Sequence, residues 1–308
     1  MKKAKVSFDS VIMPQDKKEQ IDAAISQLKR HDTIFEKWGF EEIFEKGTAI
    51  SMIFYGIPGT GKTLMAEAIS NKLGQELLVI SPAEIETQVP GGAERNIKRY
   101  FKIAAGKMGA PTAEINKQTG EPVQGPAKKH VILFDECDSL ITNRANVGMI
   151  LAGQINTILS ELEKFEGVVI FTTNRLGTLD PAIERRLTAK IEFEFPTIDL
   201  RKSIWKRMIP KKAPIAKDVD FDDLARVALT GGHIKNAVLN AARDAAYKEL
   251  KEITNDCFLA AIDEEVKSMA SFEAAFTSNE NHRGLMAGQT IDKGEDGQLR
   301  INKVRSKK

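Results

Sequence analysis

The chain has 308 residues, and its 45 lysines and arginines nearly balance its 43 aspartates and glutamates, which leaves a formal net charge of +2. That balance argues against bulk electrostatic attraction to nucleic acid or to a membrane surface. The length predicts two domains, because single cores rarely grow to this size.

Cysteine usage and hydropathy narrow the setting further. Cys137 and Cys257 lie far apart and the four histidines form no cluster, so we expect neither a disulfide framework nor a zinc site. No apolar run approaches membrane-spanning length, and polar residues follow the basic N-terminus where a signal peptide needs an apolar core. The sequence therefore predicts a soluble protein in a reducing compartment, the cytoplasm.

Apolar runs alternate with helical patterns over most of the first 196 residues. A helical pattern over 17–30 comes first. Five short strand candidates, several of them continuous apolar runs, lie at 51–55, 77–80, 131–134, 168–171 and 191–195. Helical patterns between them lie at 64–73, 93–105, 150–165 and 181–187. This order predicts an α/β fold with a five-stranded parallel sheet between two layers of helices.

The rest of the chain differs in composition. A polar stretch with Gly and Pro over 106–129 predicts an exposed inserted loop. After Pro196 the pattern is helical, at 200–208, 221–229, 234–250 and 256–269. The polar, basic stretch 277–308 predicts disorder. We therefore expect a sheet domain over 1–196, a small helical domain over 197–276 and a disordered tail over 277–308.

Residues Gly56 to Thr63 read Gly-Ile-Pro-Gly-Thr-Gly-Lys-Thr, which fits the phosphate-binding pattern of a glycine, four free positions and Gly-Lys-Thr. They lie between a predicted strand and a predicted helix, the context that the motif needs. Backbone N–H groups of such a loop converge on phosphate oxygens, and the helix N-terminus behind them adds a favourable dipole. Lys62 is then expected to reach the terminal phosphates, and Thr63 to hold magnesium.

Residues 131–138 read Val-Ile-Leu-Phe-Asp-Glu-Cys-Asp, an apolar strand that ends in acids. Open α/β sheets bind ligands at the carboxyl ends of their strands. Asp135 is expected to hold magnesium there, and Glu136 to deprotonate a water that attacks the terminal phosphate. Acids in this place can also simply cap the next helix, but a phosphate loop needs a metal-binding carboxylate on a neighbouring strand.

Polar residues also follow the run 168–171. Asn174 can bond the attacking water or the terminal phosphate, or it can merely form a turn. Arg185 and Arg186 lie near the end of the helical pattern that begins at Pro181. Adjacent arginines on a helix are most often solvated, but an arginine delivered to the phosphate of a neighbouring subunit stabilises transition-state charge.

The order of these parts resembles the AAA clade of the AAA+ ATPases: a phosphate loop, a strand ending in Asp-Glu, a strand ending in Thr-Asn, an arginine pair and a helical domain opening with Gly-Gly. The resemblance extends from about Phe8 to Met269. It implies that Gly56 to Thr63 are the Walker A motif and Val131 to Glu136 the Walker B motif. It also implies a five-stranded αβα domain followed by a helical lid.

The same resemblance implies roles for individual residues. The catalytic set that it implies is Lys62, Glu136, Asn174, Arg185 and Arg186, with Asn174 as the sensor-1 residue and the two arginines as arginine-finger candidates. The implied metal ligands are Thr63 and Asp135. The residues implied to contact the nucleotide are Val11, Ile12, Gly56, Pro58, Gly59, Thr60, Gly61, Lys62, Thr63, Leu64, Asp135, Gly232 and His233.

Two positions depart from the family pattern. His233 stands nearest the place where members commonly carry a lid arginine. Val89 stands where protein-threading members carry an aromatic residue in a loop that lines a central pore. We therefore expect a pore loop over 84–92 with a weaker or different grip, and an ordinary strand-to-helix connection is the alternative.

For function, the resemblance implies an ATPase that uses ATP and Mg²⁺, assembles with itself into a ring, a hexamer, and remodels a protein client, directly or through an adaptor. The alternative is an ATPase that handles nucleic acid, such as a loader or a transposition or replication helper, since basic residues of the tail and of 107–129 can contact phosphates. A third reading is an inactive nucleotide-binding scaffold, against which the intact Lys62, Asp135, Glu136 and Asn174 argue.

Overall fold

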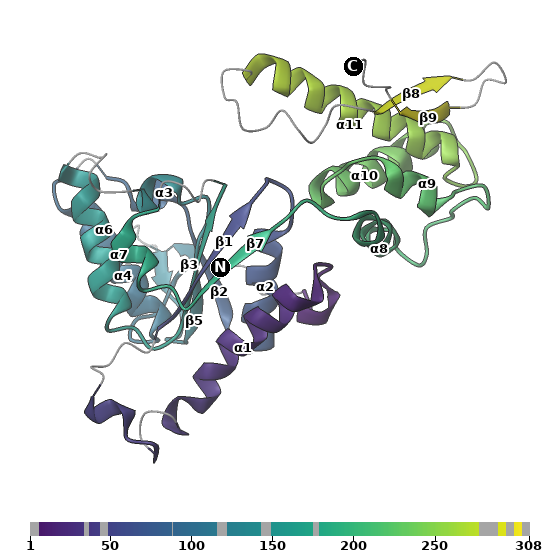
Figure 1. Cartoon of the computed structure of the whole chain (residues 1–308). Coiled ribbons are helices and arrows are strands. Elements are labelled where there is room, and N and C mark those ends of the chain that lie inside the picture. The colour runs from purple at the N-terminus through teal and green to yellow at the C-terminus, as the bar shows by residue number, and fades with distance from the viewer. Residues whose placement is uncertain are drawn as a thin grey trace, which may run out of the picture. The chain divides into compact units, whose positions relative to one another are not determined.

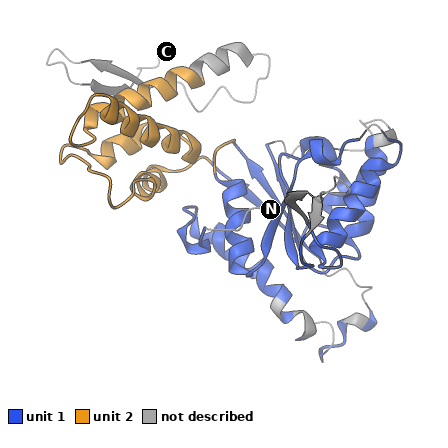
Figure 2. Ribbon diagram, turned by 180° about the vertical axis from the view of Figure 1, so that it is seen from behind, with its two compact units in different colours: residues 1–57, 61–194 blue, residues 58–60, 195–308 orange. Residues whose placement is uncertain are grey.

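The structure is a computed structural model. It describes residues 6–33, 37–43, 49–87, 89–115, 122–142, 149–174, 179–276, 289–293 and 299–303. The chain divides into two compact units, one of Met1–Ile57 with Gly61–Glu194 and the other of Pro58–Thr60 with Phe195–Lys308 (Figure 2).

The first unit is built on a five-stranded sheet. Its strands are β1 (Ile50–Gly56), β2 (Glu76–Ile80), β5 (His130–Phe134), β6 (Val168–Thr173) and β7 (Ala189–Phe193). Their order across the sheet is β2-β5-β6-β1-β7, and every neighbouring pair is parallel. The five predicted strands and the α/β fold class are therefore confirmed.

Helices cover both faces of this sheet (Figure 1). The helices of one face are α1 (Gln15–Asp32) and α2 (Lys62–Lys72), and those of the other are α4 (Gly92–Ala104) and α6 (Met149–Leu162). Successive side chains of β1 alternate between the two cores: Met52 and Phe54 pack with α1 and α2, and Ile53 packs with α4 and α6. The two strands β5 and β6, inside the sheet, are buried at every position, whereas the edge strand β7 alternates between buried and exposed residues.

Short helical turns connect these elements. They are η1 (Phe8–Ser10), η3 (Phe40–Glu42), α3 (Pro82–Ile85), α5 (Asp138–Ile141) and α7 (Pro181–Glu184). Asp180 caps α7 by accepting a hydrogen bond from the N–H of Ala182. The predicted helix over 181–187 thus ends at Glu184, and both arginines follow it in a turn.

The stretch predicted as an inserted loop, 106–129, contains two antiparallel strands, β3 (Pro111–Ile115) and β4 (Pro122–Gln124). The prediction of a loop is therefore wrong for these residues. Strands this short, with a proline at the start of each, carry too little alternation to be recognised from sequence. Residues 116–121 lie outside the described part of the chain.

The second unit contains four helices in its described residues: α8 (Ile198–Met208), α9 (Phe221–Arg226), α10 (Gly231–Tyr247) and α11 (Asn255–Phe276). Its core includes Trp205 and Phe258, whose rings pack edge to face with centroids 5.9 Å apart. Each of these helices begins within three residues of a predicted helical start. A helical pattern is readable here because buried apolar residues recur every three or four positions.

The tail predicted to be disordered contains an antiparallel pair of strands, β8 (Gln289–Lys293) and β9 (Leu299–Lys303). Disorder was the wrong prediction for these ten residues. The polar composition of the tail conceals two short β segments, each with a β-branched residue at its centre, Ile291 and Ile301. Residues 277–288, 294–298 and 304–308 lie outside the described residues.

Across the described ranges, no helix combines the length and the apolar character needed to span a membrane.

Gly56 ends β1 against the backbone of β7. Its φ is 136°, and a Cβ atom there would lie 2.3 Å from the carbonyl oxygen of Phe193. Backbone strain and overpacking together should make Gly56→Ala lower the free energy of unfolding by about 3 kcal/mol. Gly74→Ala is the matched control, because Gly74 has a φ of 66° but no atom within 4 Å of a Cβ, and it should cost about 1 to 2 kcal/mol. Urea unfolding measures both, and equal losses would contradict the close approach.

Candidate active site

The phosphate-loop motif lies between β1 and α2, as predicted. Residues 57–61 join the two elements, and Gly61, with a φ of 103°, is the N-cap of α2. The first N–H groups of a helix have no partner within the helix. Together with the helix dipole they form a site that favours an anion.

Lys62, the first residue of α2, holds its ammonium group against the loop. Its Nζ donates to the carbonyl oxygens of Gly56 (2.7 Å) and Ile57 (3.1 Å) and to Oδ1 of Asn174 (2.8 Å). Burial lowers the pKa of Lys62, and three nearby carboxylates oppose that shift. The ammonium group therefore has only neutral acceptors, and charged phosphate oxygens would bind it more strongly.

Asp135 follows β5, and its carboxylate lies beside the first turn of α2. The two carboxylate oxygens are 3.1 Å and 3.2 Å from Oγ1 of Thr63. Thr172 of β6 donates a shorter hydrogen bond, 2.6 Å, to Oδ1 of Asp135. A hydroxyl group and a carboxylate from different elements thus meet, as the sequence predicted for a metal site.

Glu136 has an unusual backbone and a free side chain. Its φ is 50°, uncommon for a residue other than glycine, and its N–H donates to Oγ1 of Thr172 at 2.8 Å. Its carboxylate is exposed and makes no hydrogen bond or ion pair with the residues that the structure describes. A carboxylate without a hydrogen-bond partner among the described residues, beside the predicted metal ligand Asp135, suits a base that takes a proton from water.

Strand order explains why these groups meet. β5, β6 and β1 are neighbours, so their carboxyl ends form one edge of the sheet. The predicted residues gathered at that edge are Lys62, Thr63, Asp135, Glu136 and Asn174.

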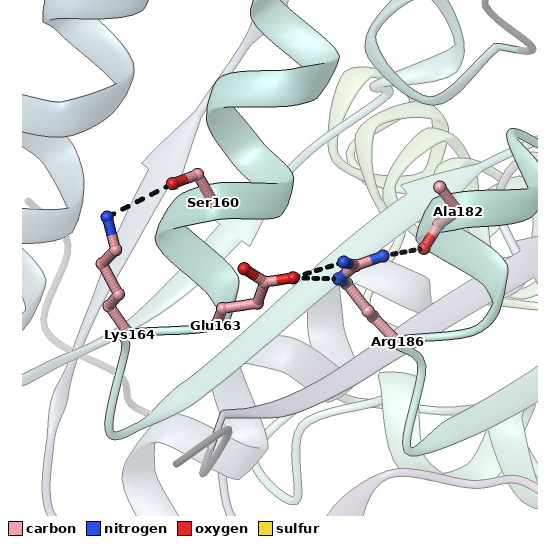
Figure 3. Close-up of polar contacts among 5 residues, drawn as sticks. All are labelled: Ser160, Glu163, Lys164, Ala182 and Arg186. Atoms are coloured by element: carbon pink, nitrogen blue, oxygen red, sulfur yellow. Dashed lines mark hydrogen bonds and ion pairs between the residues drawn. The ribbon is translucent and has the colours of Figure 1, made fainter. Parts of the chain in front are cut away.

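The two arginines have different surroundings, and Figure 3 shows those of Arg186. Arg186 forms an ion pair with Glu163, with Nε 3.1 Å from Oε1, and its Nη1 donates to the carbonyl oxygen of Ala182 at 3.0 Å. The carbonyl oxygen of Arg186 accepts a hydrogen bond from the hydroxyl of Ser51. Arg185 is exposed, and it has no hydrogen-bond or ion-pair partner among the described residues. Of these two arginines, Arg185 is therefore the one whose guanidinium group has no partner among the described residues.

The tip of the phosphate loop packs within the second unit. The carbonyl oxygen of Gly59 accepts the N–H of Gly232 at 2.8 Å, and a Cβ on Gly59 would lie 2.7 Å from Oγ1 of Thr230. Thr230 caps α10, and its Oγ1 is 2.9 Å from Nδ1 of His233. Burial lowers the pKa of His233, with a nearby carboxylate opposing the shift, so the neutral ring is favoured.

Four other predicted residues lie outside the hydrogen-bonded set. Val11 is a buried core residue, Ile12 is half-buried and Leu64 is exposed. Val89, 57% exposed, lies in the turn before α4. Its neighbour Gln88 is outside the described residues.

The donor set fits a magnesium nucleotide. Hydroxyl and carboxylate oxygens, here from Thr63 and Asp135, are the ligands that Mg²⁺ prefers. The described residues contain no group of three or more His, Cys, Asp or Glu side chains able to hold a metal. The pair of Thr63 and Asp135 suits Mg²⁺, which is usually bound through one or two carboxylates together with phosphate and water.

Sequence analysis missed two residues of this site, Thr172 and Thr173. Thr172 contacts Asp135 and Glu136, and Thr173 donates to Oδ1 of Asp138 at 2.5 Å. The sequence feature that could have identified them is a pair of consecutive hydroxyl side chains at the end of a strand that is buried throughout. Buried hydroxyls need hydrogen-bond partners, and the acidic turn supplies them.

Comparisons with protein-family models and with known proteins both find similarity to this chain. Residues 52–195 match the family model described as "ATPase family associated with various cellular activities (AAA)". The chain is 30% identical to a Cell division cycle protein 48 homolog of Archaeoglobus fulgidus, over 73% of this chain and 28% of that protein. It is 31% identical to 26S proteasome regulatory subunit 7 of Dictyostelium discoideum, over 72% of this chain and 50% of that protein. It is 29% identical to the vesicular-fusion protein SEC18 of Candida albicans, over 83% of this chain and 35% of that protein. The chain thus spans half or less of the length of each of these relatives.

Proposed function

Residues 52–195 match the AAA ATPase family, and we propose on that premise that the chain uses ATP hydrolysis to remodel a protein client. We further propose that it works as a ring, a hexamer of identical subunits. The observation that carries the ATP-dependent part is the hydrogen-bonded set at the carboxyl edge of β1, β5 and β6, in which Lys62 bonds Asn174 and Thr63 lies beside Asp135.

Each residue of the set has a role in hydrolysis. Lys62 and the loop N–H groups bind and orient the phosphates of ATP. Thr63 and Asp135 would hold Mg²⁺, which when bound neutralises phosphate charge. Glu136 accepts the proton of the attacking water, because its carboxylate has no other partner in the described residues. Asn174 fixes Lys62 and offers its amide to the same water.

Arg185 is our choice for the finger that acts on a neighbouring subunit. A trans-acting guanidinium group must be exposed and uncommitted, and Arg185 meets both conditions. Arg186 is also exposed, but it is not uncommitted, since Glu163 and the carbonyl oxygen of Ala182 hold it. We therefore assign Arg186 to positioning the turn that carries Arg185. This division of labour supports a ring, because the finger of each subunit then needs a neighbour.

Two observations support a protein client. The relatives include a proteasome regulatory subunit and a vesicular-fusion protein. Val89 presents an exposed apolar side chain in the turn before α4, and such a side chain can grip an unfolded polypeptide by burying apolar surface. The roles of Val11, Ile12, Gly232 and His233 at the nucleotide stay predictions.

A feature of α4 favours the second candidate, an ATPase that handles nucleic acid. Four cations lie at positions i, i+3, i+4 and i+7, on one face of the helix: Arg95, Lys98, Arg99 and Lys102. All four are exposed, and none forms a hydrogen bond or ion pair with a described residue. A row of cations without counter-charges suits the phosphates of a nucleic acid.

Glu136→Gln tests the catalytic assignment. The amide cannot accept the proton, so ATP turnover should fall by about 100-fold or more, while ATP affinity stays within about twofold of wild type. Glu166→Gln, at an exposed acid before β6, is the control and should retain full turnover. Steady-state phosphate release and calorimetric ATP binding give the two readouts. Normal turnover in Glu136→Gln would refute the assignment of the base.

The same variant, locked with ATP, should retain its client. Proteins that remain bound with ATP and leave on exchange to ADP would support a protein remodeller. Retention of nucleic acid alone would replace that proposal with the second candidate.

Arg185→Ala should lower ATP turnover by a factor of about 1,000, whereas Arg186→Ala should lose mainly stability. The decisive measurement is the ATP turnover of a mixture of two inactive variants, because a finger that acts on a neighbouring subunit predicts that turnover recovers. Inactive Arg185→Ala and inactive Glu136→Gln subunits should regain activity when combined, since some sites then contain an intact Glu136 and a neighbour's intact Arg185. The assignment of Arg185 as the finger would be contradicted if the mixed subunits regained no ATP turnover and Arg186→Ala lowered turnover more than Arg185→Ala.

Binding of a single-stranded oligonucleotide at several salt concentrations separates the two candidate functions. If α4 contacts phosphates, Lys98→Ala with Lys102→Ala should reduce the slope of log affinity against log salt by about 1.4, or 0.7 per cation. Lys211→Ala with Lys212→Ala, two exposed cations of the second unit, should leave the slope unchanged. Binding that is absent or independent of salt leaves only the protein remodeller.

A further inference from the structure

Thr172 is a buried residue between the two acids of the site. It lies on β6, the middle strand of five, and is 1% exposed. Its Oγ1 donates to Oδ1 of Asp135 at 2.6 Å and accepts the N–H of Glu136 at 2.8 Å. One hydroxyl group therefore uses its single proton and a lone pair on two consecutive residues.

The contact to Asp135 distinguishes the two carboxylate oxygens. Thr63 Oγ1 is almost equidistant from them, at 3.1 Å and 3.2 Å. Thr172 bonds Oδ1 alone, with the shorter and hence stronger charge-assisted hydrogen bond. This hydrogen bond fixes the rotation of the Asp135 carboxylate group. Oδ2, to which Thr172 does not donate, keeps more of its lone pairs available to accept another bond.

The contact to Glu136 holds a strained backbone. A φ of 50° is disfavoured for a residue with a Cβ, and such a conformation persists only where its surroundings enforce it. The hydrogen bond from the Glu136 N–H to Thr172 is an enforcing contact, and the N–H of Cys137 donates to the carbonyl oxygen of Thr172 at 3.0 Å. Thr172 thus determines where the chain turns after Asp135, and with it where the Glu136 side chain begins.

We propose that Thr172 is a positioning residue for hydrolysis, which sets the metal-binding carboxylate of Asp135 and the backbone of the base Glu136 through one hydroxyl group. The inference rests on the proposed function, since it assigns Thr172 to the acids that act on ATP. A hydroxyl that merely satisfied buried polar groups would stabilise the fold without changing how the site responds to Mg²⁺.

Thr172→Val removes the hydroxyl and keeps the shape. Outer-sphere partners of metal ligands typically contribute 10- to 100-fold to metal affinity or activity. The Mg²⁺ concentration that half-saturates ATP binding should therefore rise by about tenfold or more, and kcat at saturating Mg²⁺ should fall by a factor in about the same range. ATP affinity in EDTA should stay within about twofold of wild type, because Thr172 does not touch the phosphate loop. Thr172→Ser retains the hydroxyl and should restore both values to within about threefold.

Thr157→Val is the matched control. Thr157 lies on α6 of the same unit and donates to the carbonyl oxygen of Gly153, so its replacement tests a generic loss of a half-buried hydroxyl. It should leave the Mg²⁺ dependence unchanged, even if thermal unfolding shifts. Calorimetric ATP titrations at stepped Mg²⁺ concentrations give the main readout, independent of turnover.

Each outcome decides the question. Unchanged Mg²⁺ dependence in Thr172→Val, or an equal defect in Thr172→Ser, overturns the proposal. If Thr172→Val does not fold, Thr172→Ala against Thr172→Ser makes the same comparison, and a Ser variant as defective as Ala or Val, or unable to fold, also overturns it. If the wild-type chain does not bind ATP in a Mg²⁺-dependent manner, the proposed function itself is refuted. That result is distinct from any result on Thr172.

Discussion

The register of three parallel strands is the constraint on which the site depends. Phe134 of β5 pairs with Phe171 of β6, so Asp135 and Thr172 are the next residues on adjacent strands. Tyr55 of β1 pairs with Thr173, so Gly56 and Asn174 follow together in the same way. The hydrogen bonds of Thr172 to Asp135, and of Lys62 to Gly56 and Asn174, are consequences of this alignment. A slip of one residue in β6 would send the side chain of Thr172 to the opposite face of the sheet.

Lys62 ties the phosphate loop to the neighbouring strand end through its ammonium group. Three neutral oxygens accept its protons, and two of them are carbonyl groups of the loop that the lysine serves. These hydrogen bonds hold the end of β1 against α2. A loop held in this way loses less conformational entropy when it binds phosphate.

Sequence alone predicted the five strands, because most of them are continuous apolar runs and β7 alternates between apolar and polar residues. It also predicted the positions of Lys62 and Asp135, because their motifs are short and contiguous. It missed β3, β4, β8 and β9, which are polar and at most five residues long, so neither composition nor period separates them from loops. It also missed Thr172, whose partners lie 36 and 37 residues away along the chain. It could not separate Arg185 from Arg186, since the difference arises from Glu163, a residue of another segment.

Successive side chains of a strand point to opposite faces of the sheet, and the end of β6 uses both. Thr172 bonds Asp135, and Thr173 bonds Asp138, the first residue of α5. The turn between those acids also carries Glu136, so three carboxylates lie within four residues and repel one another. Donors from both faces of β6 offset that repulsion, and the positive charge of Lys62 offsets it further. The positions of the acids therefore depend on β6 at least as much as on β5, the strand that carries them.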